Sequence, residues 1–246
     1  MASTVTTTII DTGGLLFDLD GTLVDSIASV EAAWRLWSES EGIHLDAIPS
    51  SHGRTAYELL APLVPPDRLA AAVAALSRLE QNSPVPVLAL QGTKNLLQKL
   101  PNECWAVVTS ARRDVAQARL RSAGLTPPKH MVTAEDVQHG KPDPEAFVRG
   151  VTLVAQRNHP CAAFEDSVAG LRSARAAGCY VIAVTGTTPY DILRAHADTV
   201  INSLNDVIDV VVTGDNIRLT LHDHDPRTAT HGSHGVAKHQ SAAVEF

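Results

Sequence analysis

The chain has 246 residues, of which 44% are hydrophobic and 19% are charged, and its formal net charge is -7. This length can hold one large core and a second, smaller one, and the acidic balance disfavours nucleic acid or an anionic membrane as a partner. No stretch approaches the roughly 20 apolar residues of a membrane span, and the first eight residues lack the basic and apolar regions of a signal peptide. Three widely separated cysteines are typical of reduced, buried thiols. We therefore expect a cytoplasmic globular monomer.

A short apolar run, Leu15–Phe17, follows two glycines and predicts a buried parallel strand. Two carboxylates come directly after it, Asp18 and Asp20. Asp18 would lie at the carboxyl end of the strand, where open α/β sheets bind ligands. Two acids so close repel each other unless a cation or a shared proton holds them. Either they form an aspartate nucleophile beside an acid/base, with magnesium screening both, or Asp20 and Gly21 merely form a turn.

The next segment, residues 24–87, has the pattern of helices without strands. Apolar side chains recur at helical spacing over residues 26–41, with Ser26 placed to cap the start and Gly42 the end. Two further helices are expected over residues 55–63 and 66–80. A stiff linker, Ser83-Pro84-Val85-Pro86, closes the segment. We interpret residues 24–87 as a helical cap joined to the main domain by two hinge strands.

Strands and helices then alternate, which implies βαβ units and a parallel sheet. The expected helices cover residues 93–100, 113–123, 144–156 and 167–177, and the expected strands cover 105–108, 131–132, 162–164 and 180–184. Near the end, residues 210–212 and 217–221 flank Thr213-Gly214-Asp215-Asn216, which predicts an antiparallel hairpin.

The predicted fold is therefore a Rossmann-like, three-layer α/β core with an inserted helical cap. The core consists of residues 1–23 and 88–221. Residues 222–246 are polar, contain five histidines and show little periodicity. They are either a metal-binding segment or a flexible tail, and the lack of regular ligand spacing favours the tail.

Polar residues follow the expected strands in a complementary set. They are Asp18 and Asp20, Thr109 and Ser110, Lys141, and Glu165 with Asp166. This set resembles the four motifs of the haloacid dehalogenase superfamily, in the right order and on the right elements, over residues 15 to about 221. Four motifs in register are far more specific than any one alone. The resemblance implies this superfamily's fold.

The resemblance also implies roles in phosphoryl transfer, which needs charge neutralisation and in-line positioning. Asp18 would attack phosphorus and form an aspartyl phosphate, and Asp20 would protonate the leaving alkoxide and then activate water. Thr109 would offer a hydroxyl to the phosphate, with Ser110 as a candidate substrate-binding residue, and Lys141 would supply positive charge. The alternative for Lys141 is an ordinary solvated surface lysine.

The resemblance further implies bound Mg²⁺. Asp166, together with Glu165, would hold it with Asp18 and the main-chain carbonyl of Asp20. The alternative for Glu165 and Asp166 is a charge pair stabilised by a helix N-terminus, which is compatible with a metal site.

Two details choose among members of the superfamily. Its dehalogenases lack an acid at the position of Asp20, so carbon–halogen cleavage is not expected. The helical cap and the segment Ser51-His52-Gly53-Arg54 resemble those of sugar-phosphate and glycerol-phosphate phosphatases, including 2-deoxyglucose-6-phosphatases. His52 and Arg54 are candidate substrate contacts, or else part of an exposed loop. The family often has glycine where Ala111 stands; this departure concerns the backbone phosphate donors and does not concern Thr109.

The resulting hypothesis is a Mg²⁺-dependent phosphatase of small phosphorylated sugars or polyols. One alternative is a β-phosphoglucomutase-like isomerase, in which Arg54 would grip a second phosphate; Thr22, which follows Gly21 as in the phosphatases, argues against it. Another is a catalytically inactive binding or scaffold protein. The intact set of Asp18, Asp20, Lys141 and Asp166 argues against that alternative.

Overall fold

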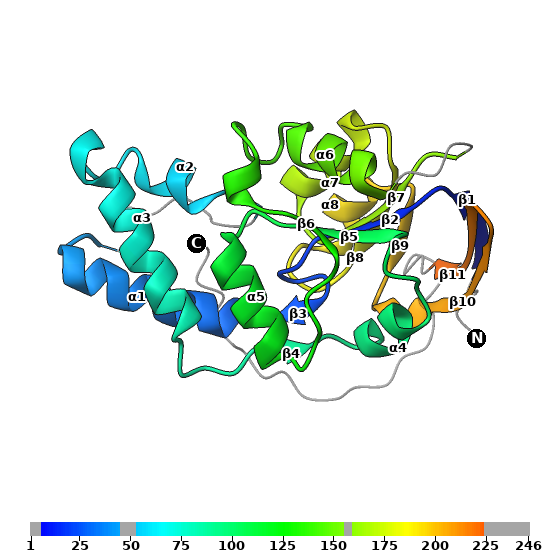
Figure 1. The fold of residues 1–246 in the computed structure, drawn as a ribbon, viewed down its shortest axis with the longest axis horizontal. Coiled ribbons are helices and arrows are strands. Elements are labelled where there is room, and N and C mark those ends of the chain that lie inside the picture. The colour runs from blue at the N-terminus through cyan, green and yellow to red at the C-terminus, as the bar shows by residue number, and fades with distance from the viewer. Residues whose placement is uncertain (1–5, 45–52, 155–158, 224–246) are drawn as a thin grey trace, which may run out of the picture.

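The computed structural model describes residues 6–44, 53–154 and 159–223. At the centre of this described part, six parallel strands form a sheet in the order β6-β5-β2-β7-β8-β9 (Figure 1). The strands are β2 (Leu15–Phe17), β5 (Trp105–Val108), β6 (His130–Val132), β7 (Ala162–Glu165), β8 (Tyr180–Val184) and β9 (Thr199–Ile201). The expected parallel α/β sheet is confirmed, and β9 extends it by a strand that the sequence pattern did not predict.

Helices cover both faces of the sheet because successive strand side chains point to opposite sides. In β2, Leu15 and Phe17 belong to one buried cluster and Leu16 to another. The first cluster includes side chains of α4 (Thr93–Gln98) and α5 (Arg113–Ser122). The second includes side chains of α6 (Glu145–Val154), α7 (Val168–Ala176) and α8 (Tyr190–Arg194). This is the expected three-layer arrangement.

A small antiparallel sheet, in the order β1-β11-β10, extends the first layer. Its strands are β1 (Thr6–Thr12), β10 (Val207–Thr213) and β11 (Asn216–Asp223). The expected hairpin between β10 and β11 is confirmed. Strand β1 was not predicted, and β11 continues two residues past the expected end of the core at Leu221, because Thr6 and Thr7 pair with Asp223 and His222.

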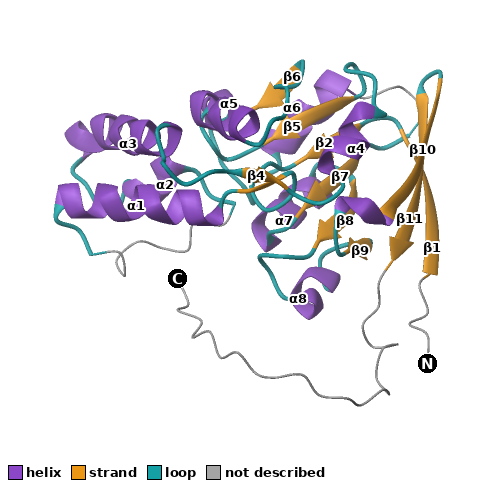
Figure 2. Cartoon of the chain, turned by 90° about the horizontal axis from the view of Figure 1, so that it is seen from below, coloured by secondary structure: helices purple, strands orange, loops and turns teal. Residues whose placement is uncertain are grey.

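The inserted segment forms the helices α1 (Ile27–Glu41), α2 (Ala56–Leu60) and α3 (Pro66–Gln81). They share a buried core of their own that includes Trp34 and Trp37. Two short antiparallel strands, β3 (Val24–Asp25) and β4 (Leu88–Ala89), join this segment to the rest of the chain. Figure 2 shows the three helices at one end of the molecule and the small antiparallel sheet at the other. Here we call residues 24–87 the cap.

The ends of α1 test the capping predictions. Gly42 ends the helix in the left-handed conformation, as expected. The prediction for Ser26 is wrong, because its side chain makes no capping hydrogen bond. Its hydroxyl instead donates to Asp20 Oδ1 at 2.6 Å.

Two short 3-10 helices, Ala134–Asp136 and Leu204–Asp206, complete the regular structure of the described residues. The three cysteines are buried and free, as expected. Within the described ranges, no helix is long and apolar enough to cross a membrane.

Candidate active site

The sheet order brings the motif residues to one edge. Strand β2 lies between β5 and β7, and Phe17 pairs in parallel register with Val107 and Phe164. Asp18 follows β2 directly, Thr109 follows β5, and Glu165 is the last residue of β7. Because carboxyl ends of neighbouring parallel strands meet at one edge, residues about 90 and 150 positions apart become neighbours.

Lys141 links all three of these strand ends. Its Nζ donates to Asp18 Oδ1 at 2.5 Å, to Glu165 Oε1 at 2.7 Å and to the carbonyl oxygen of Val108 at 3.0 Å. All three possible donor directions of the ammonium group are therefore used. Lys141 is only 2% exposed, which excludes the alternative of a solvated surface lysine.

Three buried carboxylates, those of Asp18, Glu165 and Asp166, lie within 4.8 Å of one another. Burial, together with Glu165 and Asp20, raises the pKa of Asp18 to about 7, although Lys141 opposes this shift. Burial, together with Glu165 and Asp18, raises the pKa of Asp166 well above its usual value. One lysine thus does not balance the negative charge of the cluster.

This excess of negative charge fits a divalent cation. The donors are all carboxylate oxygens, which suit Mg²⁺. Gly21 allows the close approach that the cluster requires: its φ is +88°, and a Cβ there would lie 2.2 Å from Asp166 Oδ2. The residues at this edge therefore fit the expected metal.

Glu165 also organises the loop that follows β7. Its Oε2 accepts hydrogen bonds from the backbone N–H groups of Asp166 and Ser167, at 2.9 and 2.8 Å, and from Ser167 Oγ at 2.9 Å. Ser167 Oγ in turn accepts from the N–H of Gly170 and caps α7. Thr187 donates to the carboxylate of Asp166. Each acid in this loop is thus held in one orientation.

The carboxylate of Asp20 is not among the three clustered carboxylates. Its Oδ1 accepts from Ser26, and its Oδ2 accepts from Arg119 Nη1 at 2.8 Å. Arg119 lies on α5 and is buried. Sequence reasoning missed it, because nothing in the local pattern distinguishes it from Arg112, Arg113 and Arg121 nearby.

Thr109 and Ser110 follow β5, beside a contact between the core and the cap. Thr109 is buried, and its Oγ1 accepts from the N–H of Ala111 at 3.1 Å. Ser110 donates to the carbonyl oxygen of Gly53, a residue of the cap, at 2.7 Å. Arg54 is exposed, and His52 lies outside the described residues. The structure therefore brings Thr109 and Ser110 to the edge, and it leaves the roles of Arg54 and His52 as predictions.

A model of the haloacid dehalogenase-like hydrolases matches residues 13–178, about two thirds of the chain. The chain belongs to this family. The expected superfamily and fold are confirmed.

Three known proteins show how this hydrolase relates to others. Hexitol phosphatase A of Escherichia coli is 39% identical over 201 residues, which are 79% of this chain and 92% of that protein. Glycerol-1-phosphate phosphohydrolase 2 of Saccharomyces cerevisiae is 33% identical, over 73% of this chain and 77% of that protein. A crystal structure of a hydrolase from Pseudomonas syringae matches with a TM-score of 0.66 and 29% identity, over 79% of this chain and 95% of that one.

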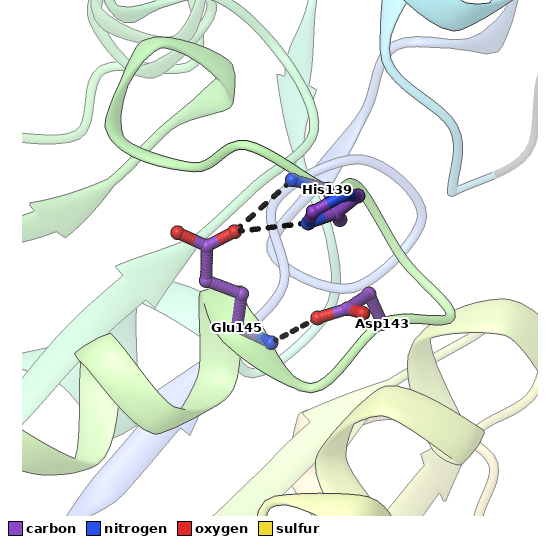
Figure 3. Close-up of side chains that lie close together, drawn as sticks. All are labelled: His139, Asp143 and Glu145. Carbon is purple, nitrogen blue, oxygen red and sulfur yellow. Dashed lines mark hydrogen bonds and ion pairs between the residues drawn. The ribbon is translucent and has the colours of Figure 1, made fainter.

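In this hydrolase, the loop that carries Lys141 and the start of α6 hold two further acidic side chains, Asp143 and Glu145, close to His139 (Figure 3). Glu145 Oε2 accepts from the backbone N–H groups of Gln138 and His139, at 2.8 and 3.0 Å, and Asp143 Oδ1 accepts from the N–H of Glu145 at 2.9 Å. Arg149 pairs with Glu145 and, with these backbone bonds, lowers its pKa to about 2. These carboxylates therefore shape the loop that carries Lys141.

The cap contacts the same loop. Glu58 Oε1 accepts from the N–H of Gly140 at 3.1 Å, while its Oε2 accepts from the N–H and hydroxyl of Thr55. Thr55 and Glu58 form the capping box of α2. The start of α2 is thereby joined to the residue before Lys141.

Proposed function

We propose that this hydrolase is a Mg²⁺-dependent phosphatase of small sugar or polyol monophosphates. The observation that carries the proposal is the buried contact of Lys141 with both Asp18 and Glu165, beside a separately held Asp20. A nucleophile, an acid/base and a fixed positive charge are the groups that phosphoryl transfer through a covalent intermediate needs. The names of the two similar phosphatases support a phosphorylated polyol as the substrate class.

In the proposed reaction, a carboxylate oxygen of Asp18 attacks phosphorus, and the bond to the alcohol oxygen breaks. Asp20 gives its proton to the departing oxygen, which leaves as the neutral alcohol. Asp20 then takes a proton from the water that attacks the aspartyl phosphate, which releases inorganic phosphate and restores Asp18. Lys141 offsets negative charge beside Asp18, and the Thr109 hydroxyl, which accepts from Ala111, donates its hydrogen to a phosphate oxygen.

We assign the metal to Asp18, Asp166 and the main-chain carbonyl of Asp20, with Glu165 at the same cluster. Mg²⁺, when bound, supplies positive charge that offsets both the carboxylates and the phosphate. Because both oxygens of Glu165 already accept hydrogen bonds, its main effect is to orient Lys141 and the loop after β7.

The cap suits a small alcohol as leaving group. The Ser110–Gly53 and Gly140–Glu58 contacts hold cap residues against the loops of the site, which keeps bulk water away from the phosphate. Arg54 adjoins this contact and is our candidate for a polar interaction with the alcohol, with His52 as a second candidate. The expected monomeric state stays a prediction.

The test is magnesium-dependent phosphate release across a panel of sugar, polyol and nucleotide monophosphates. We expect activity on hexitol and glycerol phosphates, loss of it in chelator, recovery with Mg²⁺ and inhibition by Ca²⁺, whose looser coordination disturbs in-line attack. Full activity in chelator would contradict the metal site. Conversion of β-glucose 1-phosphate to glucose 6-phosphate, with a trace of the 1,6-bisphosphate and little free phosphate, would favour a mutase instead.

A further inference from the structure

Arg119 connects the acid/base to the cap. Its Nη1 donates to Asp20 Oδ2 and its Nη2 donates to Glu80 Oε1, both at 2.8 Å. Arg119 lies on α5 of the core, whereas Glu80 lies in the last turn of α3 in the cap. The side chain of Arg119 is 6% exposed and that of Glu80 is 13% exposed. One buried guanidinium thus holds two carboxylates from different parts of the molecule.

This buried group needs both partners. Leaving a charge buried without its partner is strongly unfavourable, whereas a fully paired set can be tolerated. If α3 moved away from α5, Glu80 would leave the guanidinium, and Arg119 would lose half of its charge compensation. The position of the cap and the grip on Asp20 are therefore linked through one side chain.

The hydrogen bonds also distinguish the two oxygens of Asp20. A guanidinium can only donate, so Oδ2 is held as an acceptor in both protonation states of the carboxyl. The Ser26 hydroxyl at Oδ1 can donate to the carboxylate or accept from the protonated acid. Of these two partners, Ser26 can accept the proton of the acid and Arg119 cannot, which makes Oδ1 the oxygen suited to carry the transferable proton.

We propose that Arg119 is a positioning residue that fixes the Asp20 carboxyl for proton transfer from Oδ1 and ties that orientation to the docking of α3 through Glu80. This inference rests on the proposed function, since it assigns Asp20 as the acid/base. Arg119 itself does not touch the substrate; it acts through Asp20.

The chain offers a matched control at the same interface. Asp114, one helical turn and a half before Arg119 on α5, accepts hydrogen bonds from Ser77 and from Gln81 on α3. No hydrogen bond or ion pair of the described residues joins Asp114 to Asp20. Asp114→Asn therefore removes charge from a neighbouring polar contact between α3 and α5, while the Arg119–Asp20 and Arg119–Glu80 hydrogen bonds stay in place.

The experiment compares kcat/KM on glycerol 1-phosphate, whose alkoxide needs a proton to leave, and on p-nitrophenyl phosphate, whose phenolate does not. kcat/KM reports the transfer to Asp18, before water attacks. We expect Arg119→Met to lower kcat/KM on the glycerol ester about tenfold or more relative to the aryl ester. Arg119→Lys, which keeps the charge but not the fork, should recover part of this loss.

Glu80→Gln provides a second test in case Arg119→Met does not fold, because it keeps the shape of the partner side chain and removes only its charge. We expect it to show a smaller loss in the same direction, whereas Asp114→Asn should affect both esters equally. If Arg119→Lys and Glu80→Gln lower kcat/KM equally on both esters while the wild-type enzyme is active, the role proposed for Arg119 is wrong and the proposed function still stands. If glycerol 1-phosphate is not turned over, the same comparison uses the best substrate of the sugar and polyol phosphate panel. A wild-type enzyme inactive on that whole panel and on the aryl ester would overturn the proposed function and this inference with it.

Discussion

At the scale of single residues, Asp18 carries the most specific expectation. It is nearly fully buried, it accepts from Lys141, and burial raises its pKa to about 7. Asp18→Asn keeps the volume and removes both the nucleophile and one of the crowded negative charges. We therefore expect phosphatase activity to fall at least about 1000-fold while the protein stays folded.

The measurements are phosphate release and thermal unfolding of the same preparation. Asp20→Asn serves as the comparison, because it leaves the nucleophile in place and slows both proton transfers. With p-nitrophenyl phosphate, whose leaving group needs no proton, only the hydrolysis of the aspartyl phosphate is slowed, so the intermediate accumulates and can be trapped by acid quench. Substantial turnover by pure Asp18→Asn would refute the covalent mechanism.

At the scale of elements, the capping box of α2 serves two purposes. Thr55 and Glu58 close the first turn of the helix, and Glu58 also holds the N–H of Gly140 beside Lys141. Thr55→Ala removes a cap and should cost about 1 kcal/mol of stability. Glu58→Ala should cost a similar amount and, in addition, lower kcat/KM several-fold, because it frees the loop that positions Lys141.

Urea denaturation and steady-state kinetics on both variants separate these two effects. The Thr55 variant acts as the control for helix stability, with kinetics close to wild type. Equal kinetic losses in the two variants would mean that the Glu58–Gly140 contact has no separate effect on the site.

At the scale of the whole molecule, β1 joins the start of the described chain to its end. Along this pairing, Asp11 bonds Arg218 and Asn216, which lower its pKa from 3.8 to about 2. A carboxyl group whose pKa is lower in the folded than in the unfolded protein stabilises the fold at pH values above its unfolded-state pKa. This contribution should be complete above about pH 4 and lost as the pH falls toward about 2.

Asp11→Asn should therefore flatten the dependence of the urea midpoint on pH between about pH 4 and pH 2. Arg218→Gln, which removes the main partner, should flatten the same window. An unchanged slope in both variants would show that this pair does not couple protonation to folding.

The order of elements was predictable from the sequence because the signals are local. Apolar runs such as Leu15–Phe17 and Trp105–Val108, and the helical spacing of Trp34 and Trp37, mark strands and helices within a few residues. The same locality explains why Asp18, Thr109 and Asp166 could be placed at strand ends, since each directly follows or adjoins a strand. Strand β1 was missed because its threonines show no alternation of apolar and polar residues.

The sequence by itself thus determined the α/β class, the inserted helical cap and the motif residues at the strand ends. Only the tertiary structure decided what Asp20, Ser26, Glu80 and Arg119 do together. Asp20 and Arg119 are 99 positions apart, and Glu80 lies on a different helix from Arg119. A long side chain finds such partners only after the sheet order and the docking of the cap have brought their helices together, so no local pattern encodes the contact.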